Sequence, residues 1–254
     1  MIARTEKDRS GLRTAGKMLA SILHGAARRA VPGVSAGELD AFVKQETLAH
    51  GAVPVFLNYE TDGSPYPYPA TVCISRNDEV VHGIPVKEKI LSEGDIVSLD
   101  CGLSYEGYVV DAAVTVIVGK GSEDLERLLR GTREALEAGI GAARPGGHVG
   151  DIGEAIAAVA KKYDLAVVRD LGGHATGKEL HEDPYIANFG TRGRGEKLEE
   201  GHVLALEPIF TLGGGAIKLA HDGWTYMTAD RSRAAHFEHT ILLGENGAEI
   251  LTRL

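Results

Sequence analysis

Two aspartates stand inside apolar, β-branched segments, where an unpaired charge is costly. Asp100 lies within residues 96–102 and Asp111 within residues 108–114, and a short connection containing Gly107 joins the two segments. This pattern predicts a β-hairpin. A buried carboxylate without a partner is strongly unfavourable or stays protonated. The hairpin would bring the two carboxylates together, where they repel each other unless a cation lies between them. Alternatively, each aspartate ends a strand and faces water.

Four segments of the first half of the chain recur, in the same order, in the second half. The pairs are residues 32–39 with 145–152, 82–85 with 181–184, 91–100 with 198–207, and 110–114 with 237–241. Such a repeat favours a duplicated unit whose copies pack about an approximate two-fold axis. We therefore predict a single domain spanning residues 1–254, with pseudo-symmetric halves at about residues 1–120 and 121–254.

The two-fold arrangement would bring four carboxylates together at its axis. They belong to Asp100, Asp111, Glu207 and Glu238. Their combined charge exceeds that of one divalent ion, and oxygen ligands with a histidine or two suit a pair of divalent first-row metals roughly 3.5–4 Å apart. His174, in a glycine-rich segment, is the candidate imidazole ligand. A lone histidine in such a loop is, however, more often a surface or hydrogen-bonding residue.

The other histidines have less specific contexts. His82 and His181 occupy matching turns, where they could complete the ligand set, donate hydrogen bonds to a substrate carbonyl or its tetrahedral intermediate, or serve the turns alone. We interpret the remaining ones as structural or solvated: His24, His50, His148, His202, His221, His236 and His239.

The composition is that of an ordinary globular protein. The 254 residues are 43% hydrophobic and 25% charged, with a formal net charge of −9. Nucleic-acid binding requires a clustered basic face, whereas Lys and Arg are spread along this chain. No apolar run is long enough to span a bilayer, the first ten residues are too charged for a signal-peptide core, and the two cysteines form no ligand-spaced cluster. We expect a cytoplasmic protein without membrane or nucleic-acid partners.

Helices and short strands must position these residues. Apolar residues at helical spacing and the Ser35–Glu38 capping-box pattern define the first two helices. Helices are predicted over residues 6–30, 35–50, 123–143 and 149–163, and short strands over residues 53–59, 70–75 and 79–82. The fold class is α+β.

Several of these segments together resemble the motif set of type I methionine aminopeptidases. The segments are residues 81–85, 99–102, 110–111, 173–174, 206–208 and 238–240, which span nearly the whole chain. The resemblance implies the pita-bread (creatinase/aminopeptidase) fold, two α/β halves around a dinuclear metal site. It also implies five metal ligands, namely Asp100, Asp111, His174, Glu207 and Glu238. By the same resemblance Asp111 and Glu238 bridge the two ions, His82 and His181 bind substrate, and Glu207 is the general base.

The implied activity is hydrolytic removal of the initiator methionine from nascent proteins and peptides with a small second residue. Co, Mn, Fe or Zn would polarise the scissile carbonyl and lower the pKa of a bound water. Glu207 would pass a proton to the leaving amine. The implied partners are nascent polypeptide N-termini, with the ribosome as a candidate contact, and the protein is expected to be a monomer.

Two other functions fit part of the pattern. An Xaa-Pro exopeptidase of the same fold would use the same ligands, but such enzymes commonly carry an extra N-terminal domain for which this chain is too short. A non-catalytic pita-bread binding module would have lost metal ligands, whereas here all five positions are filled.

A methionine side chain calls for an apolar slot with aromatic or sulfur-containing walls. The resemblance places five further residues around this slot, namely Phe56, Tyr59, Tyr68, Cys73 and Trp224. Trp224 lies in a Gly-flanked loop that could cover the site, whereas Tyr59 and Tyr68 could simply pack. The sequence departs from the family pattern in a short insertion from Thr61 to Pro65, in Ala175 and Thr176, and in Leu180, where an aromatic is common. These departures concern the shape of the pocket and not its metal ligands.

Overall fold

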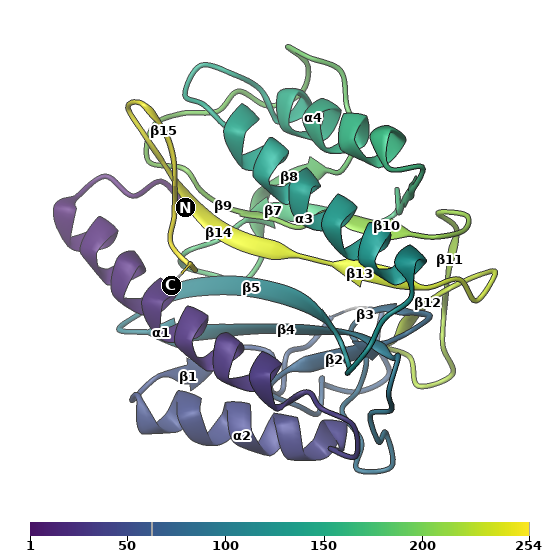
Figure 1. Ribbon diagram of the computed structural model, residues 1–254. Coiled ribbons are helices and arrows are strands. Elements are labelled where there is room, and N and C mark those ends of the chain that lie inside the picture. Colours follow the sequence, from purple (N-terminus) through teal and green to yellow (C-terminus); the bar gives the residue numbers. More distant parts are fainter. Residues whose placement is uncertain (62, 254) are drawn as a thin grey trace.

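A curved sheet crosses the molecule and carries helices on one side (Figure 1). The computed structural model describes residues 1–61 and 63–253. Within them, nine strands form the main sheet: β1 (Val53–Pro54), β2 (Cys73–Arg76), β4 (Ile96–Tyr105), β5 (Tyr108–Ile117), β7 (Gly172–Ala175), β8 (Glu182–Ala187), β9 (Val203–Leu206), β14 (Glu238–Gly244) and β15 (Gly247–Ile250). The order across the sheet is β1-β4-β5-β14-β9-β7-β8, with β2 paired to β4 and β15 paired to β14.

Two smaller three-stranded sheets complete the β structure. One contains β6 (Ala166–Val167), β10 (Ile209–Thr211) and β13 (Ala234–His236), and the other contains β3 (Glu79–Val81), β11 (Ile217–Leu219) and β12 (Tyr226–Thr228). Both sheets bring segments that are distant in sequence close to the strands that bear the predicted site residues.

Four helices pack in two pairs against the main sheet (Figure 1). They are α1 (Glu6–Arg29), α2 (Ala36–Ala49), α3 (Glu123–Ala142) and α4 (Val149–Lys162). The first pair buries Leu12, Leu19 and Leu39 against β4 and β5, and the second pair packs with β9 and β14 around Ile152 and Phe210. Their bounds confirm the predicted helices to within two residues. The predicted capping box between Ser35 and Glu38 is also present. None of the helices in the described part of the chain is long and apolar enough to cross a membrane.

The predicted hairpin is β4 and β5. Its two-residue turn, Glu106 and Gly107, has φ angles of 50° and 77°, which is the backbone of the type I′ turns that match strand twist. Asp100 pairs with Ala113, and Gly102 pairs with Asp111. Since side chains alternate between the faces of a sheet, both aspartates lie on the same face. The hairpin therefore brings the two carboxylates together as predicted.

The repeated segments make equivalent contacts in the two halves. The amide of Gly33 donates to the Leu91 carbonyl at 2.8 Å, and the amide of Gly146 donates to the Leu198 carbonyl at 2.8 Å. Gly94 and Gly201, at matching positions, have φ angles of 84° and 89°. Strands from the two halves meet where β5 pairs with β14. The division near residue 120 stays a prediction.

The segment that follows β1 differs from the expected strand over residues 53–59. Only Val53 and Pro54 pair with β4. The chain then turns, because Asn58 has a φ of 64° and the amide of Tyr59 donates to the Phe56 carbonyl at 2.9 Å. This turn takes Phe56 and Tyr59 out of the sheet and places them in the wall of a cavity.

Candidate metal centre and substrate cavity

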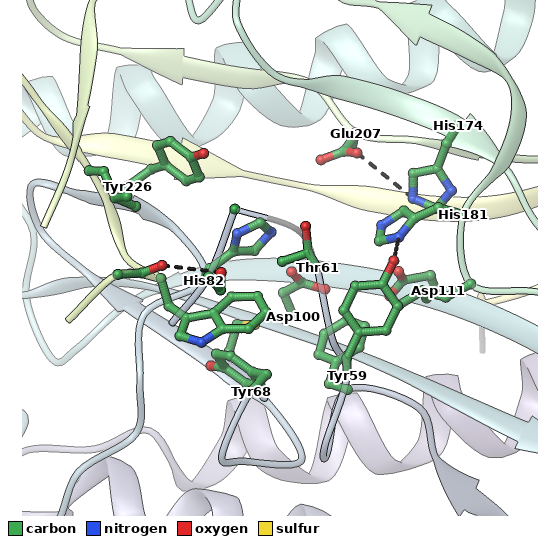
Figure 2. Close-up of a pocket in the computed structure, with 18 of the residues that line it drawn as sticks. Tyr59, Thr61, Tyr68, His82, Asp100, Asp111, His174, His181, Glu207 and Tyr226 are labelled. Carbon is green, nitrogen blue, oxygen red and sulfur yellow. Dashed lines mark hydrogen bonds and ion pairs between the residues drawn. The ribbon is translucent and has the colours of Figure 1, made fainter. Parts of the chain in front are cut away.

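All five predicted metal ligands line one cavity. Figure 2 labels Asp100, Asp111, His174 and Glu207 in this cavity. Asp111, His174 and Glu238 each offer a ligand atom, and these three atoms lie within 4.8 Å of one another. The Nε2 atom of His174 is 4.0 Å from an oxygen of Glu238 and 4.0 Å from Oε1 of Glu207. Asp100 lies beside Asp111 on the face of the hairpin. The structure thus brings together residues from β4, β5, β7 and β14 with Glu207, which follows β9.

The junction of β5 and β14 fixes the position of the two candidate bridging carboxylates. The hydroxyl of Thr240 accepts a hydrogen bond from the Asp111 amide at 2.9 Å and donates one to the Asp111 carbonyl at 2.7 Å. Glu238 pairs with Ala113 across the same junction. The backbone on both sides of the candidate ion site is therefore held by hydrogen bonds.

A close approach of two strands sets the position of His174. A Cβ atom on Gly173 would lie only 2.3 Å from the Ala205 carbonyl oxygen, so a glycine is needed where β7 meets β9. Asn188, which directly follows β8, donates its side-chain amide to the Glu207 carbonyl at 2.9 Å. These contacts hold the imidazole and the second-half carboxylate on facing segments.

The electrostatics of this cluster favour a bound cation. Burial raises the pKa of Asp100 and of Glu238 well above the ordinary values, and the neighbouring carboxylates raise them further. Burial also raises the pKa of Asp111 to about 6. Oδ1 of Asp100 is buried and has no hydrogen-bond partner among the described residues. Carboxylate oxygens with an imidazole are suitable ligands for divalent first-row metals, so the residues present fit a metal site.

His82 and His181 flank the same cavity (Figure 2). Loss of hydration lowers the pKa of His82 to about 4. Partial loss of hydration and the adjacent His174 place the pKa of His181 below its ordinary value. His82 has a φ of 58°, an uncommon conformation for a non-glycine residue that is often found at functional sites. Both rings are neutral at pH 7 and can each donate one N–H to a substrate.

The hydroxyl of Tyr59 lies 2.7 Å from Nδ1 of His181 (Figure 2). If the phenol donates this hydrogen bond, Nδ1 is an acceptor and the ring proton stays on Nε2. Tyr59 therefore does more than pack. The contact orients the ring of His181, and the tautomer that accepts at Nδ1 keeps its proton on Nε2.

The expected pocket residues line a cavity of about 270 Å³ that reaches the carboxylate cluster. The wall of this cavity contains Phe56, Tyr59, Tyr68, Cys73 and Trp224, and their role in binding substrate stays a prediction. Seven further lining residues were not singled out as substrate-binding: Thr61, Gly63, Ser64, Leu180, Leu219, Gly223 and Tyr226.

Three of these additional residues belong to the predicted insertion near the pocket. Thr61, Gly63 and Ser64 line the cavity, and Asp62 lies outside the described residues. Of the other departures from the family pattern, Leu180 contributes to the wall, whereas Ala175 and Thr176 are buried in and directly after β7.

Trp224 lies in the wall of the cavity. The indole N–H donates to the Tyr66 carbonyl at 2.9 Å, which ties the Trp224 loop to the segment containing the insertion. Its ring lies edge-on to Tyr68, with ring centroids 5.1 Å apart. These contacts make an aromatic wall from two loops that are far apart in the sequence.

One histidine near the site was missed. We expected His236 to be structural or solvated, but it is 1% exposed, and its Nε2 lies 3.3 Å from Oε2 of Glu207. A solvated role is therefore wrong for this residue. Its position two residues before Glu238, a predicted metal ligand, was the available signal.

Buried carboxylates and an imidazole beside an apolar cavity are the arrangement of a metal-dependent hydrolase. The chain belongs to metallopeptidase family M24, whose model matches residues 10–245. It is 44% identical over 253 residues to a methionine aminopeptidase of Aquifex aeolicus, covering 98% of each chain. It is also 43% identical to a methionine aminopeptidase of Thermotoga maritima of known structure, with a TM-score of 0.95 and full coverage of both chains. These matches confirm the resemblance to type I methionine aminopeptidases and the pita-bread fold that the sequence predicted.

A prolidase from Pyrococcus furiosus shares the fold but is more distant. Its TM-score is 0.76 at 22% identity, and the match covers all of this chain but 66% of the prolidase. This likeness concerns the fold alone.

Proposed function

We propose that this protein is a methionine aminopeptidase, which hydrolyses the peptide bond after an N-terminal methionine. The observation that carries the proposal is that five metal-ligand candidates meet at a cavity whose remaining walls are largely aromatic and apolar. A flexible thioether side chain packs well against aromatic rings. The relatives named methionine aminopeptidase, which are similar over the whole chain, support the same activity.

The proposed metal site contains two divalent ions. They would be held by Asp100, Asp111, His174, Glu207 and Glu238. Co, Mn, Fe and Zn all suit this donor set. Such a pair supplies Lewis-acid polarisation of the scissile carbonyl and activation of water.

The side chains around the ions bind the substrate and move protons. In our proposal Nε2–H of His181, oriented by Tyr59, donates to the carbonyl oxygen of the scissile bond, and His82 donates to the same region from the opposite wall. Glu207 accepts a proton from the attacking water and passes it to the departing amine nitrogen. Trp224 and Tyr68 exclude water from the slot that holds the methionine side chain.

The substrates would be the N-termini of newly made polypeptides with a small second residue. We place the reaction in the cytoplasm, where new chains emerge, with the ribosome as a candidate contact and the enzyme as a monomer. An Xaa-Pro exopeptidase is less well supported, because the likeness to prolidase extends only to the fold. A non-catalytic binding module is disfavoured by the complete set of ligand positions.

The proposal is tested by removing metals with a chelator and adding back Mn²⁺, Fe²⁺, Co²⁺ or Zn²⁺ one at a time. Hydrolysis of Met-Ala-Ser, Met-Leu-Ser and an Xaa-Pro peptide is then followed for each form. We expect Met-Ala-Ser to be cleaved only after metal is restored, and the other two peptides to react much more slowly. Preferential cleavage of the Xaa-Pro peptide, or full activity of the metal-free protein, would contradict the proposal.

A further inference from the structure

His236 occupies a rigid position next to the carboxylate cluster. It is the last residue of β13 and pairs with Ile209 of β10. Its amide donates to the hydroxyl of Thr115 at 2.9 Å, and the same hydroxyl donates to the His236 carbonyl at 2.5 Å. Because Thr115 lies on β5, the backbone of His236 is fixed to the strand that carries Asp111. The backbone of His236 is therefore held next to the site.

The carboxylate of Glu207 lies between two imidazoles. Its Oε1 atom is 4.0 Å from Nε2 of His174, and its Oε2 atom is 3.3 Å from Nε2 of His236. One oxygen thus faces the candidate metal ligand, and the other faces away from it toward β13. This division suits a carboxylate that binds an ion through one oxygen and is held in place through the other.

The ring of His236 is available for that second contact. Both of its nitrogens are buried, and neither has a hydrogen-bond partner within the described residues. A buried polar atom without a partner is costly, so such a group in a folded protein calls for an explanation. The oxygen of Glu207 is close enough to accept a hydrogen bond from Nε2 after a small rotation of either side chain.

We propose that His236 is a positioning residue, which donates its Nε2–H to Oε2 of Glu207 and leaves Oε1 free to bind the metal ion. The inference depends on the ligand role of Glu207 in the proposed function. Hydrogen bonds from a second layer of residues orient metal ligands, and losing one typically costs 10- to 100-fold in metal affinity or activity. His236 would accordingly raise the affinity for metal without touching the ion or the substrate.

The experiment measures Mn²⁺ binding to chelator-treated protein by isothermal titration calorimetry. The variants are His236→Phe, which keeps a ring but has no donor, His236→Ala, which removes the ring, and His236→Gln, which offers an amide N–H of similar reach. His202→Phe is the matched control, since His202 is also buried but caps a turn away from the cavity by accepting from the Glu199 amide at 3.1 Å. The thermal midpoint of each metal-free variant shows whether it is folded.

We expect the Phe and Ala variants to bind Mn²⁺ about 10- to 100-fold more weakly than wild type, and the Gln variant to retain most of the affinity. The control should bind as wild type does. If the Phe variant does not fold, the Ala variant decides the question. Unchanged affinity in the folded Phe or Ala variant would overturn the inference, as would an equal loss in the Gln variant, which would indicate a direct ligand. Failure of the wild-type protein itself to bind Mn²⁺ would instead refute the proposed function.

Discussion

Replacing Asp111 with Asn should make the metal-free protein more stable while abolishing its response to metal. Asp111 is buried in a cluster of like charges, and its pKa is raised to about 6 from the ordinary 3.8. Asparagine has nearly the same shape, and its amide oxygen can still accept the hydrogen bond that the Ala112 amide now donates to Oδ1 at 2.9 Å. The substitution therefore removes a charge and little else.

The sign and size of the effect follow from the raised pKa. Below about pH 4 the aspartate is protonated in both states, so its charge costs the folded state nothing. Between about pH 4 and pH 6 the unfolded chain loses the proton while the folded protein keeps it, and stability falls as the pH rises. Above pH 6 the aspartate is charged in both states, and the folded protein bears the full cost of burying that charge. The rise in the pKa of Asp111 from 3.8 to about 6 lowers the free energy of unfolding by at most roughly 3 kcal/mol. Asp111→Asn should restore this stability at pH 8.

Bound metal should reverse the relative stability of the wild-type protein and the Asp111→Asn variant. At a free metal concentration about 1,000-fold above the dissociation constant, binding stabilises the wild-type protein by about 4 kcal/mol. The variant lacks one of the candidate ligand carboxylates and should gain little. We expect Asp111→Asn to be the more stable protein in chelator and the less stable one in saturating Mn²⁺.

Urea unfolding of both proteins at pH 4, 6 and 8, with and without Mn²⁺, measures these differences. Asp230→Asn is a useful comparison, because hydrogen bonds from Ser232 and Gly214 lower the pKa of that carboxyl to about 2. Its loss should destabilise the protein at pH 8. A metal-free Asp111→Asn protein that is less stable than wild type at pH 8, or a stability difference that does not vary with pH, would refute the reasoning.

Three further substitutions test the cavity and its supports. Tyr59→Phe removes the hydrogen bond that orients His181 and should lower kcat about fivefold to tenfold in a peptide-hydrolysis assay. Tyr163→Phe loses a hydrogen bond far from the cavity and should leave kcat unchanged. Trp224→Ala opens one wall of the slot, so we expect KM for methionyl peptides to rise roughly tenfold, with a smaller change in kcat; an unchanged KM would place the methionine side chain elsewhere. Gly173→Ala adds a Cβ atom 2.3 Å from a carbonyl oxygen of β9, so it should lower the free energy of unfolding by about 1–3 kcal/mol. Thermal or urea unfolding measures this loss, and a midpoint equal to that of wild type would show that β7 moves aside freely.

Local patterns in the sequence were sufficient for the elements that carry the first-half carboxylates. Alternation in β4 and β5 and the two-residue turn between them determine which face Asp100 and Asp111 share. Caps at Ser35 and Ser122 mark where two helices begin. These features depend on neighbours in the sequence, so they can be read without a structure.

The rest of the site depends on contacts between distant segments. Tyr226 reaches the cavity because β12 pairs with β3, and no local pattern encodes that pairing. His236 looked like any strand histidine until the structure showed Glu207 beside it. The choice of His174 as a candidate ligand depended on the carboxylates elsewhere in the chain, since a histidine among glycines has no distinctive spacing of its own.

The junction of β5 and β14 also has a consequence for when the enzyme can become active. Asp111 and Glu238 lie on opposite sides of this junction, and Thr240 joins it by hydrogen bonds to the Asp111 backbone. In the proposed metal site, an ion held by both carboxylates would need β5 and β14 together. During synthesis, a chain that has not yet delivered β14 to its place would lack the complete site and could not cleave the other chains being made around it.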